Sequence, residues 1–220
     1  MISGSEKFRY FHKDPSSPAR EPPQKEGIVL SILEAFLRRQ IERYIQLGFH
    51  KALDMSEEEY RSSFSFSHLL LQPDSYRRRF DIFLTVDPRI PVVEQFERAG
   101  VHEHKPDILA SSDTVLVSSK PYIAWVQTGR RYFGTKIQEA IKNFREIETG
   151  SPLIELAALF IQNPDILYPP INNGIAASAF EKDYVPLLEF AYGRTMVRNV
   201  WVGYKFCRVM SRGKDIQIAA

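Results

Sequence analysis

Residues 28–61 read IVLSILEAFLRRQIERYIQLGFHKALDMSEEEYR, and this stretch carries the strongest structural signal in the sequence. Apolar residues recur at intervals of three and four, with arginine and glutamate between them. This spacing predicts an amphipathic helix with one apolar stripe that faces the core. The positions of the stripe are Val29, Leu33, Phe36, Leu37, Gln40, Ile41, Tyr44 and Ile45.

Two helix-end signals follow this stripe. Gly48 has no Cβ atom, so it can adopt the left-handed backbone conformation that ends many helices. Ser56 and Glu59 have the spacing of a capping box, and Met55 and Tyr60 occupy the two positions of a hydrophobic staple. We therefore predict a long first helix and a further helix that begins at Ser56.

The composition is that of an ordinary globular protein. Of the 220 residues, 44% are hydrophobic and 25% are charged, and the net charge of +2 argues against a strongly basic nucleic-acid-binding arm. Cys207 is the single cysteine, which excludes an internal disulfide and favours a reducing compartment. We find no signal-peptide pattern and no run of about 20 apolar residues. A cytoplasmic protein without a membrane partner is expected.

Residues 1–27 differ in composition from the rest of the chain. Their prolines lie among Ser, Lys, Glu and Arg, and such a segment cannot bury enough apolar surface to offset its ordering entropy. We expect a disordered or loosely attached Pro-rich tail over residues 1–27 and a single domain over residues 28–220.

Alternating apolar runs and capping residues predict the remaining elements. Thr135 and Gln138 have the spacing of a second capping box, and Ser151 precedes a proline as an N-cap would. The last third of the chain is rich in strand signals and lacks helix signals, which favours an α+β fold with a largely antiparallel sheet packed with helices. Helices are expected at 91–99, 135–147 and 151–163, and strands at 80–86, 114–118, 122–127, 130–133 and several times within 184–210.

Three blocks of the sequence resemble an uncharacterised bacterial family of unknown function. They are QIERYIQLGFHKALDMSEEEY at 40–60, FDIFLTVDPRIPVVEQFERAG at 80–100 with YIAWVQTGRRYFGTKIQEAI at 122–141, and SPLIELAALFIQNPDIL at 151–167. Their order and spacing are similar over roughly residues 28–210. The blocks consist mostly of packing and capping positions, so the resemblance implies a shared fold and no particular activity. Members of the family tend to carry cysteines near the C-terminus, whereas this chain has only Cys207.

The segment GRRYFGTK at 129–136 is close to the phosphate-binding pattern G-x-x-x-x-G-K-[ST]. In that loop, small residues let successive backbone amides surround a phosphate. Here Thr135 and Lys136 stand in exchanged order, and Tyr132 and Phe133 are bulky where the loop must be tight. We therefore favour a hairpin turn and a short strand that lead into a helix over a nucleotide site.

His102 and His104 would lie on one face of a strand, with Asp107 nearby. A catalytic zinc site normally takes three protein ligands, and the third would have to come from Asp107 or from elsewhere in the fold, where no second cluster supports it. We predict a solvated loop at this position, and we assign neither a metal nor a cofactor to the chain.

Residues 192–214 contain basic residues and no acidic ones, with aromatic residues between them. This pattern suits phosphate contacts and base stacking, but an antiparallel strand with one apolar and one charged face would produce it too. The interpretation as a two-faced strand places Val200, Val202, Tyr204 and Phe206 on one face. We favour it, and we therefore do not expect nucleic acid to be the partner. The basic residues are Arg194, Arg198, Lys205, Arg208, Arg212 and Lys214.

No residue spacing fixes a catalytic group, so three hypotheses about function remain. The first is a non-catalytic binding or association domain with an unidentified partner, which leaves open whether copies of the chain associate. The second is a protein or enzyme that binds a small anionic ligand through Arg130, Arg194 and Arg198, because guanidinium groups match carboxylates and phosphates. The third is a polyanion binder that uses the basic C-terminal strands. Cys207 is expected to be a buried small hydrophobe, and Arg77–Arg79 a solvated run before a strand.

Overall fold

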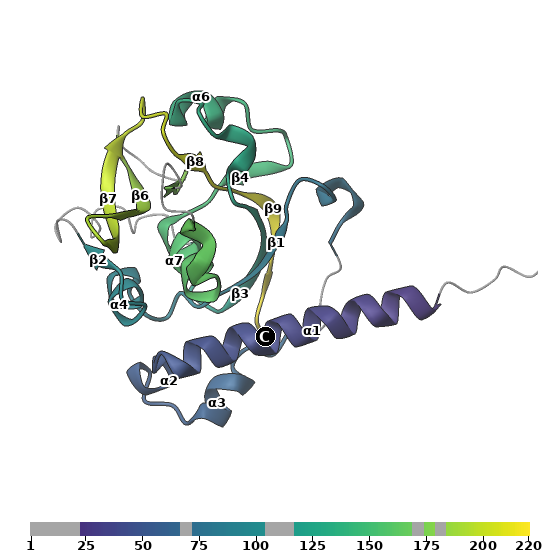
Figure 1. Ribbon diagram of the computed structural model, residues 1–220. Helices are drawn as coiled ribbons and strands as arrows, with labels where there is room; N and C mark the ends of the chain where they lie inside the picture. Colours follow the sequence, from purple (N-terminus) through teal and green to yellow (C-terminus); the bar gives the residue numbers. More distant parts are fainter. Residues whose placement is uncertain (1–22, 67–71, 104–116, 169–173, 179–183) are drawn as a thin grey trace, which may run out of the picture.

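The computed structural model describes residues 23–66, 72–103, 117–168, 174–178 and 184–220, with side chains from residue 29 onward. The chain forms an α+β fold, as predicted, in which helices pack on two sheets (Figure 1). In chain order, the first half contains α1 (Pro23–Gln46), α2 (Phe49–Ala52), α3 (Glu57–Ser62), η1 (Asp74–Tyr76), β1 (Ile82–Val86), α4 (Val92–Arg98), β2 (His102–Glu103) and β3 (Tyr122–Gln127).

The second half begins with a 3₁₀ turn after β3 and ends on a long C-terminal strand. Its elements are η2 (Arg130–Tyr132), α6 (Ile137–Lys142), β4 (Glu148–Gly150), α7 (Leu153–Gln162), η3 (Pro164–Leu167), β5 (Ile175–Ala176), β6 (Tyr184–Ala191), β7 (Arg194–Trp201), β8 (Arg208–Val209) and β9 (Ser211–Ile218).

The two sheets are mostly antiparallel. The first has the strand order β1-β3-β9-β4 and every pairing in it is antiparallel. The second has the order β2-β7-β6-β5-β8, with parallel pairings only at its short outer strands β2 and β8. The prediction of a largely antiparallel arrangement is therefore confirmed, although it is divided between two sheets.

Helix α7 lies at the centre of the fold, between the two sheets (Figure 1). Its sequence LIELAALFIQ is apolar around most of its circumference, and residues 153–161 are all buried. The core cluster that contains them also includes residues of both sheets, such as Leu84 and Val126 on one side and Leu188 and Val197 on the other. A helix that is apolar all round is typical of such a buried position.

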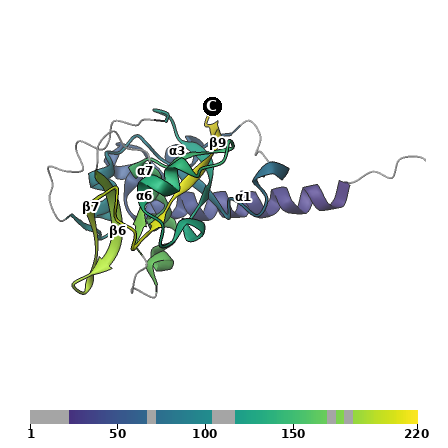
Figure 2. The same ribbon diagram turned by 90° about the horizontal axis from the view of Figure 1, so that it is seen from above.

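Helix α1 covers the first sheet and extends beyond the body of the molecule (Figures 1 and 2). Gln40, which falls in the apolar stripe, is buried, and its side-chain amide bonds to strand β1. Nε2 donates to the carbonyl oxygen of Phe83 at 2.7 Å, and Oε1 accepts from the amide of Thr85 at 2.9 Å. Since β1 is an edge strand, these bonds satisfy backbone groups that would otherwise lack partners.

The predicted helix ends at Gly48 and Ser56 are confirmed. Gly48 has a φ of 75°, in the left-handed region. Ser56 is the N-cap of α3 and forms the full capping box with Glu59. Helix α1 begins at Pro23, inside the segment predicted to be a tail, and residues 1–22 lie outside the described part of the chain.

Residues 128–151 differ from the prediction. Arg130–Tyr132 form the 3₁₀ turn η2, so no second hairpin strand follows Gly129. The predicted capping box of Thr135 and Gln138 is also wrong, because Lys136 is the N-cap of α6 and makes no side-chain capping bond. The first amides of α6 instead donate to the carbonyl oxygens of Tyr204 and Val202, which belong to a distant segment.

The helix after residue 135 is shorter than predicted, and the next helix starts differently. Helix α6 ends at Lys142, and residues 148–150 form strand β4 against β9. Pro152, not Ser151, is the N-cap of α7, and the amide of Ser151 donates to the hydroxyl of Ser178. Pairing with elements far along the chain therefore overrides the local helix signals here.

Helices in the described part of the chain are too short or too polar to cross a lipid bilayer. Of the predicted strand at 114–118, residues 114–116 lie outside the described residues, and residues 117–118 are not in a strand. His104 and Asp107 also lie outside them, whereas His102 belongs to strand β2 rather than to a solvated loop.

Candidate functional site

The three arginines predicted to bind an anion have different surroundings. Arg198 lies in β7 and is bound to Glu189 of the neighbouring strand β6. Arg194 is exposed at the start of β7, and Arg130 is exposed in η2, where its charge acts on Arg208 and helps to lower the pKa of that residue. A pocket beside β7 includes Arg198 in its lining but neither of the other two.

The segment 192–214 does not present one continuous basic face either. Arg208 is buried, and its Nη2 donates to the carbonyl oxygen of Ile166 at 2.8 Å. Burial lowers the pKa of Arg208 to about 10. Arg212 also points inward, and its Nε lies 3.3 Å from Oε1 of the buried Glu155. Two of the positive charges of this segment therefore lie inside the fold and not on its surface.

Exposed aromatic residues lie in this segment and on the neighbouring strand β6. Tyr184 and Trp201 stand directly opposite each other in the β6–β7 register, and each side chain is 58% exposed. Phe206, in the connection from β7 to β8, is 56% exposed, and it makes an edge-to-face contact with Tyr204. We call these four residues, Tyr184, Trp201, Tyr204 and Phe206, the Trp201 surface.

A shallow pocket of about 440 Å³ lies within the Trp201 surface. It is formed by residues 198–201 and 203–206 together with Lys136 at the start of α6. The Trp201 ring packs on the backbone of Gly203, where a Cβ atom would overlap the ring. Glycine at this position therefore lets the indole lie flat against the turn and form one wall of the pocket.

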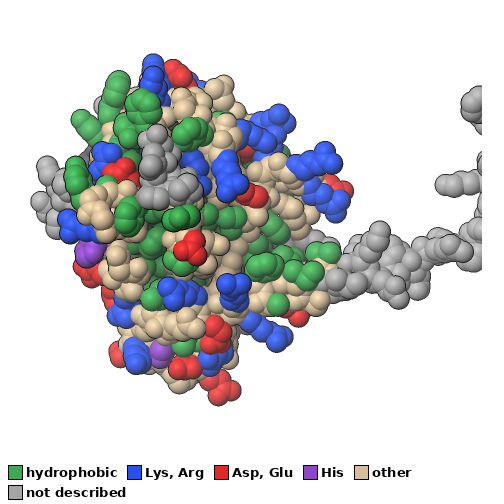
Figure 3. All heavy atoms as spheres, in the orientation of Figure 1, with side chains coloured by type: hydrophobic (Ala, Val, Ile, Leu, Met, Phe, Trp, Pro, Cys, Tyr) green, Lys and Arg blue, Asp and Glu red, His purple; other side chains and the backbone are tan. Residues whose placement is uncertain are grey.

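Cations surround this pocket, but most of them already have acidic partners. Arg198 is paired with Glu189, which raises the pKa of the guanidinium, and it also lies over the Tyr204 ring at 5.7 Å. Lys136 is 3.4 Å from Glu139. Lys205 lies 5.5 Å from the centre of the Phe206 ring. Figure 3 shows hydrophobic side chains beside Lys and Arg side chains over this end of the molecule.

The strand parity predicted for residues 200–206 holds only in part. Val200 and Val202 are buried against α6, as expected. The turn at residues 202–203 then interrupts the strand, and Phe206 is left exposed although it shares the parity of the two valines. Parity predicts a shared face only along an uninterrupted strand.

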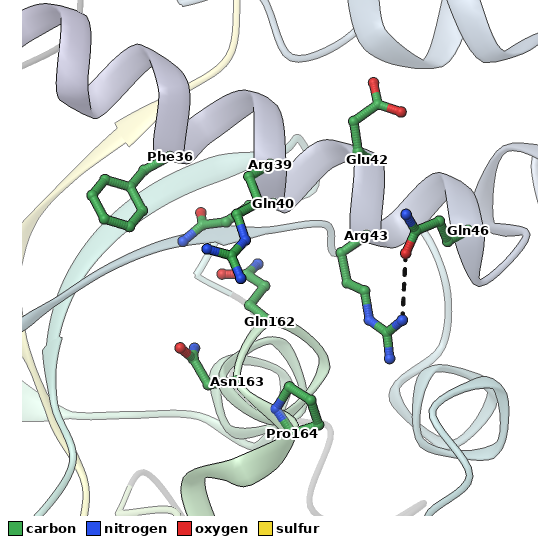
Figure 4. A pocket seen from close by; sticks show the side chains of 9 residues that line it. All are labelled: Phe36, Arg39, Gln40, Glu42, Arg43, Gln46, Gln162, Asn163 and Pro164. Atoms are coloured by element: carbon green, nitrogen blue, oxygen red, sulfur yellow. Dashed lines mark hydrogen bonds between the residues drawn. The ribbon is translucent and has the colours of Figure 1, made fainter.

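A second pocket, of about 430 Å³, lies between α1 and the C-terminal end of α7 (Figure 4). We call it the α1–α7 groove. Arg39 and Arg43 extend from α1 towards Gln162, Asn163 and Pro164 of the opposite wall (Figure 4). Phe36, Gln40, Glu42 and Gln46 complete the lining.

The sequence does not indicate this groove, since the spacing of residues 28–61 places arginines such as Arg39 and Arg43 only between the apolar positions of a helix. Phe36, Gln40 and Arg43 recur at four- and three-residue spacing, which places them on one side of α1. The opposite wall comes from a segment 118 residues further along the chain, so nothing in the local pattern indicated a pocket.

The fold also contains a buried ionisable cluster around Glu155 of α7. The hydroxyl of Tyr122 donates to Oε1 of Glu155 at 3.1 Å, and Arg212 pairs with the same oxygen. Burial raises the pKa of Glu155 to about 7, although Arg212 favours the charged form. The other carboxylate oxygen of Glu155 is buried and has no hydrogen-bond partner in the described part of the chain. Glu155 lines neither of the two pockets.

The remaining sequence candidates have structural roles. Gly129 has a φ of 78° and packs against the backbone of Val209, so the GRRYFGTK segment forms a tight turn. Arg79 was predicted to be solvated, and this prediction is wrong. Its side chain pairs at 3.1 Å with the buried Glu148. Cys207 is buried, as expected, and burial raises the pKa of its thiol to about 12. Among the described residues, no group of three or more His, Cys, Asp and Glu side chains is arranged to hold a metal ion.

Comparison of the chain with protein-family models, with curated proteins and with solved structures found no match.

Proposed function

We propose that this chain is a non-catalytic association domain, and that the Trp201 surface binds a second copy of the chain. The observation that carries this proposal is the exposure of Trp201 and Phe206 in the lining of one shallow pocket, with the exposed Tyr184 opposite Trp201 on the neighbouring strand. Contiguous exposed aromatic side chains are unusual on a soluble protein unless a partner covers them. Tryptophan, tyrosine and arginine are also the residue types that dominate the energy of protein interfaces.

The charges around the pocket favour a copy of the same surface as the partner. Two of the three cations in the lining are paired with carboxylates, so the surface presents both signs of charge. In a twofold arrangement each copy offers the same patch, and a cation of one copy can approach a carboxylate of the other. The small net charge of the chain leaves little long-range repulsion between copies.

The size of the surface sets the expected affinity. An aromatic side chain buries about 150–250 Å² at most, so three half-exposed rings from each copy supply roughly 700 Å². Stable interfaces bury about 1,200–2,000 Å², so neighbouring residues must contribute the rest. We therefore expect self-association in the micromolar range.

Nucleic acid fits this surface less well. Glu189 and Glu139 lie beside two of the cations and would repel phosphate groups. Arg208 and Arg212 point into the fold and are not available for phosphate contacts.

We also propose the cytoplasm as the compartment, supported by the single cysteine of the sequence. Membership of the uncharacterised bacterial family described above likewise stays a proposal, supported by the three sequence blocks that resemble it.

Sedimentation velocity over a concentration series from about 1 µM to about 500 µM tests the proposal, since this range spans weak dimers. The wild-type protein should shift from monomer to dimer, and Trp201→Ser and Phe206→Ser should remain monomeric. Tyr168→Ser is the matched control, because Tyr168 is more exposed than Trp201 and does not line the pocket.

A wild-type protein that stays monomeric throughout this range would contradict self-association. A different function would replace it if a labelled single-stranded oligonucleotide bound more tightly than about 1 µM at physiological salt, beyond the ordinary non-specific range. Loss of that binding in Trp201→Ser would assign the surface to nucleic acid.

A further inference from the structure

The α1–α7 groove contains a guanidinium group that the fold does not use. Arg39 is exposed and lines the groove, and its guanidinium group has no hydrogen bond or ion pair within the described part of the chain. Arg43, one helical turn further along, donates through Nε to the carbonyl oxygen of Ile161 at 3.2 Å and through Nη1 to Gln46 at 3.4 Å. Among the described residues, its Nη2 has no hydrogen-bond partner, so both arginines retain donors.

The acidic residue of the lining does not neutralise these arginines. Glu42 points away from the other lining side chains (Figure 4). Its carboxylate binds Arg61 on the far side of α1, with Nε at 2.6 Å from Oε1 and Nη2 at 3.0 Å from Oε2. The hydrogen bond from Arg61 lowers the pKa of Glu42, which stays ionised in that pair. The groove therefore has a surplus of positive charge.

The groove also has an unused acceptor and an apolar end. Gln162 donates its amide hydrogens to the Tyr44 hydroxyl at 3.2 Å and to the Thr85 carbonyl oxygen. Beside it, Asn163 donates through Nδ2 to the carbonyl oxygen of Leu159 at 3.1 Å, and its Oδ1 accepts no hydrogen bond in the described part of the chain. Phe36 forms the end of the groove towards the N-terminus of α1, and half of its surface is exposed.

We propose that the α1–α7 groove binds a small organic anion that also carries a hydroxyl group, such as a hydroxycarboxylate or a polyol phosphate. Arg39 and Arg43 would bind the anionic group through charge-assisted hydrogen bonds. The ligand hydroxyl donates to Oδ1 of Asn163, and the carbon skeleton packs on Phe36. The volume of about 430 Å³ lies within the range of small-molecule sites.

A purely structural role accounts for Arg43 but not for Arg39. The guanidinium group of Arg43 reaches from α1 to the C-terminal end of α7, where a cation stabilises the last carbonyl groups of a helix. Arg39 contacts neither those carbonyls nor a carboxylate among the described residues. The guanidinium group of Arg39 is therefore available to a ligand in the groove. The site does not depend on self-association, because the Trp201 surface contributes none of its lining residues.

Isothermal titration calorimetry of the full chain with malate, glycerol 3-phosphate and inorganic phosphate, at matched ionic strength, tests this site. Malate and glycerol 3-phosphate distinguish a carboxylate ligand from a phosphate ligand, and inorganic phosphate lacks the carbon skeleton. We expect one of the two organic anions to bind with a dissociation constant below about 1 mM. Arg39→Gln should weaken that binding by at least about tenfold, the effect of one charge-assisted hydrogen bond.

Arg38→Gln is the matched control, because Arg38 is a neighbouring exposed arginine that does not line the groove. It should change the dissociation constant less than about twofold. The proposal is overturned if neither organic anion binds at about 10 mM, or if Arg38→Gln and Arg39→Gln weaken binding equally. Trp201→Ser should leave anion binding unchanged, which separates this site from the association surface.

Discussion

At the scale of single residues, Ser56 joins the sequence signal and the folded geometry most directly. Its hydroxyl accepts from the Glu59 amide at 3.2 Å, and Oε2 of Glu59 accepts from the Ser56 amide at 2.8 Å and from the hydroxyl at 2.7 Å. We predict that Ser56→Ala lowers the free energy of unfolding by about 1 kcal/mol, measured by urea denaturation. Ser56→Thr, which keeps the hydroxyl, should stay close to wild type.

Ser56→Asp should fall between these two variants. Aspartate keeps an acceptor for the Glu59 amide, but it has no proton to donate to Glu59 Oε2 and adds a like charge beside it. Equal loss of stability in Ser56→Thr and Ser56→Ala would show that the hydroxyl does not cap α3.

The burial of Glu155 makes its effect on the stability of the fold depend on pH. Its pKa of about 7 in the folded protein lies above the ordinary value of 4.5, so between these pH values the folded state binds more protons than the unfolded state. The contribution of Glu155 to the free energy of unfolding is therefore fully present below about pH 4.5. It is lost as the pH rises through about 7, a change of about 3 kcal/mol.

Glu155→Gln isolates this effect, because the amide cannot ionise. Relative to the wild type, this variant should gain about 3 kcal/mol in free energy of unfolding between pH 5 and pH 8. Urea denaturation at the two pH values measures the difference. A difference between the two proteins that does not change with pH would mean that Glu155 stays ionised in the folded state.

At the scale of elements, the turn between β3 and η2 depends on a close backbone approach at Gly129. A Cβ atom there would overlap the backbone of Val209, and the φ of 78° adds strain for any other residue. Gly134 has nearly the same φ, 79°, but no atom lies within 4 Å of the position of its missing Cβ. Substitution of Gly129 and of Gly134 therefore separates the cost of backbone strain from the cost of steric overlap.

We predict that Gly134→Ala costs about 1 kcal/mol and Gly129→Ala about 3 kcal/mol or more. Thermal and urea denaturation of both variants check this prediction. Equal costs would mean that β8 moves away from the turn without difficulty.

Elements with complete local signals were predictable from the sequence. Strand β3 has the predicted bounds, and α7 ends before Pro164 as its sequence indicates. The start of helix α6 was predicted wrongly because the carbonyl groups that accept from its first amides belong to Val202 and Tyr204, far along the chain. Gln40 shows the same limit, since its place in the apolar stripe was visible but its bonds to an edge strand were not.

The candidate sites were less predictable than the elements. The aromatic residues of 192–214 were apparent in the sequence, whereas the inward direction of Arg208 and Arg212 depends on Ile166 and Glu155. The α1–α7 groove needs two segments that meet only in the folded chain.

At the scale of the whole molecule, two surfaces within the described residues are candidates for contact with another chain. One is the Trp201 surface, and the other is the protruding half of α1, where Val29, Ile32 and Phe36 are exposed (Figure 1). The Trp201 surface combines exposed rings, a pocket and paired charges. The α1 residues form a narrow apolar stripe that continues into the α1–α7 groove.

Hydrogen exchange at low and high protein concentration tests the association surface most directly, because it locates the contact without a mutation. We predict that amides in residues 199–206 exchange more slowly at high concentration, while those of α1 keep their rates. Slower exchange confined to residues 29–36, or no dependence on concentration anywhere, would contradict self-association through the Trp201 surface.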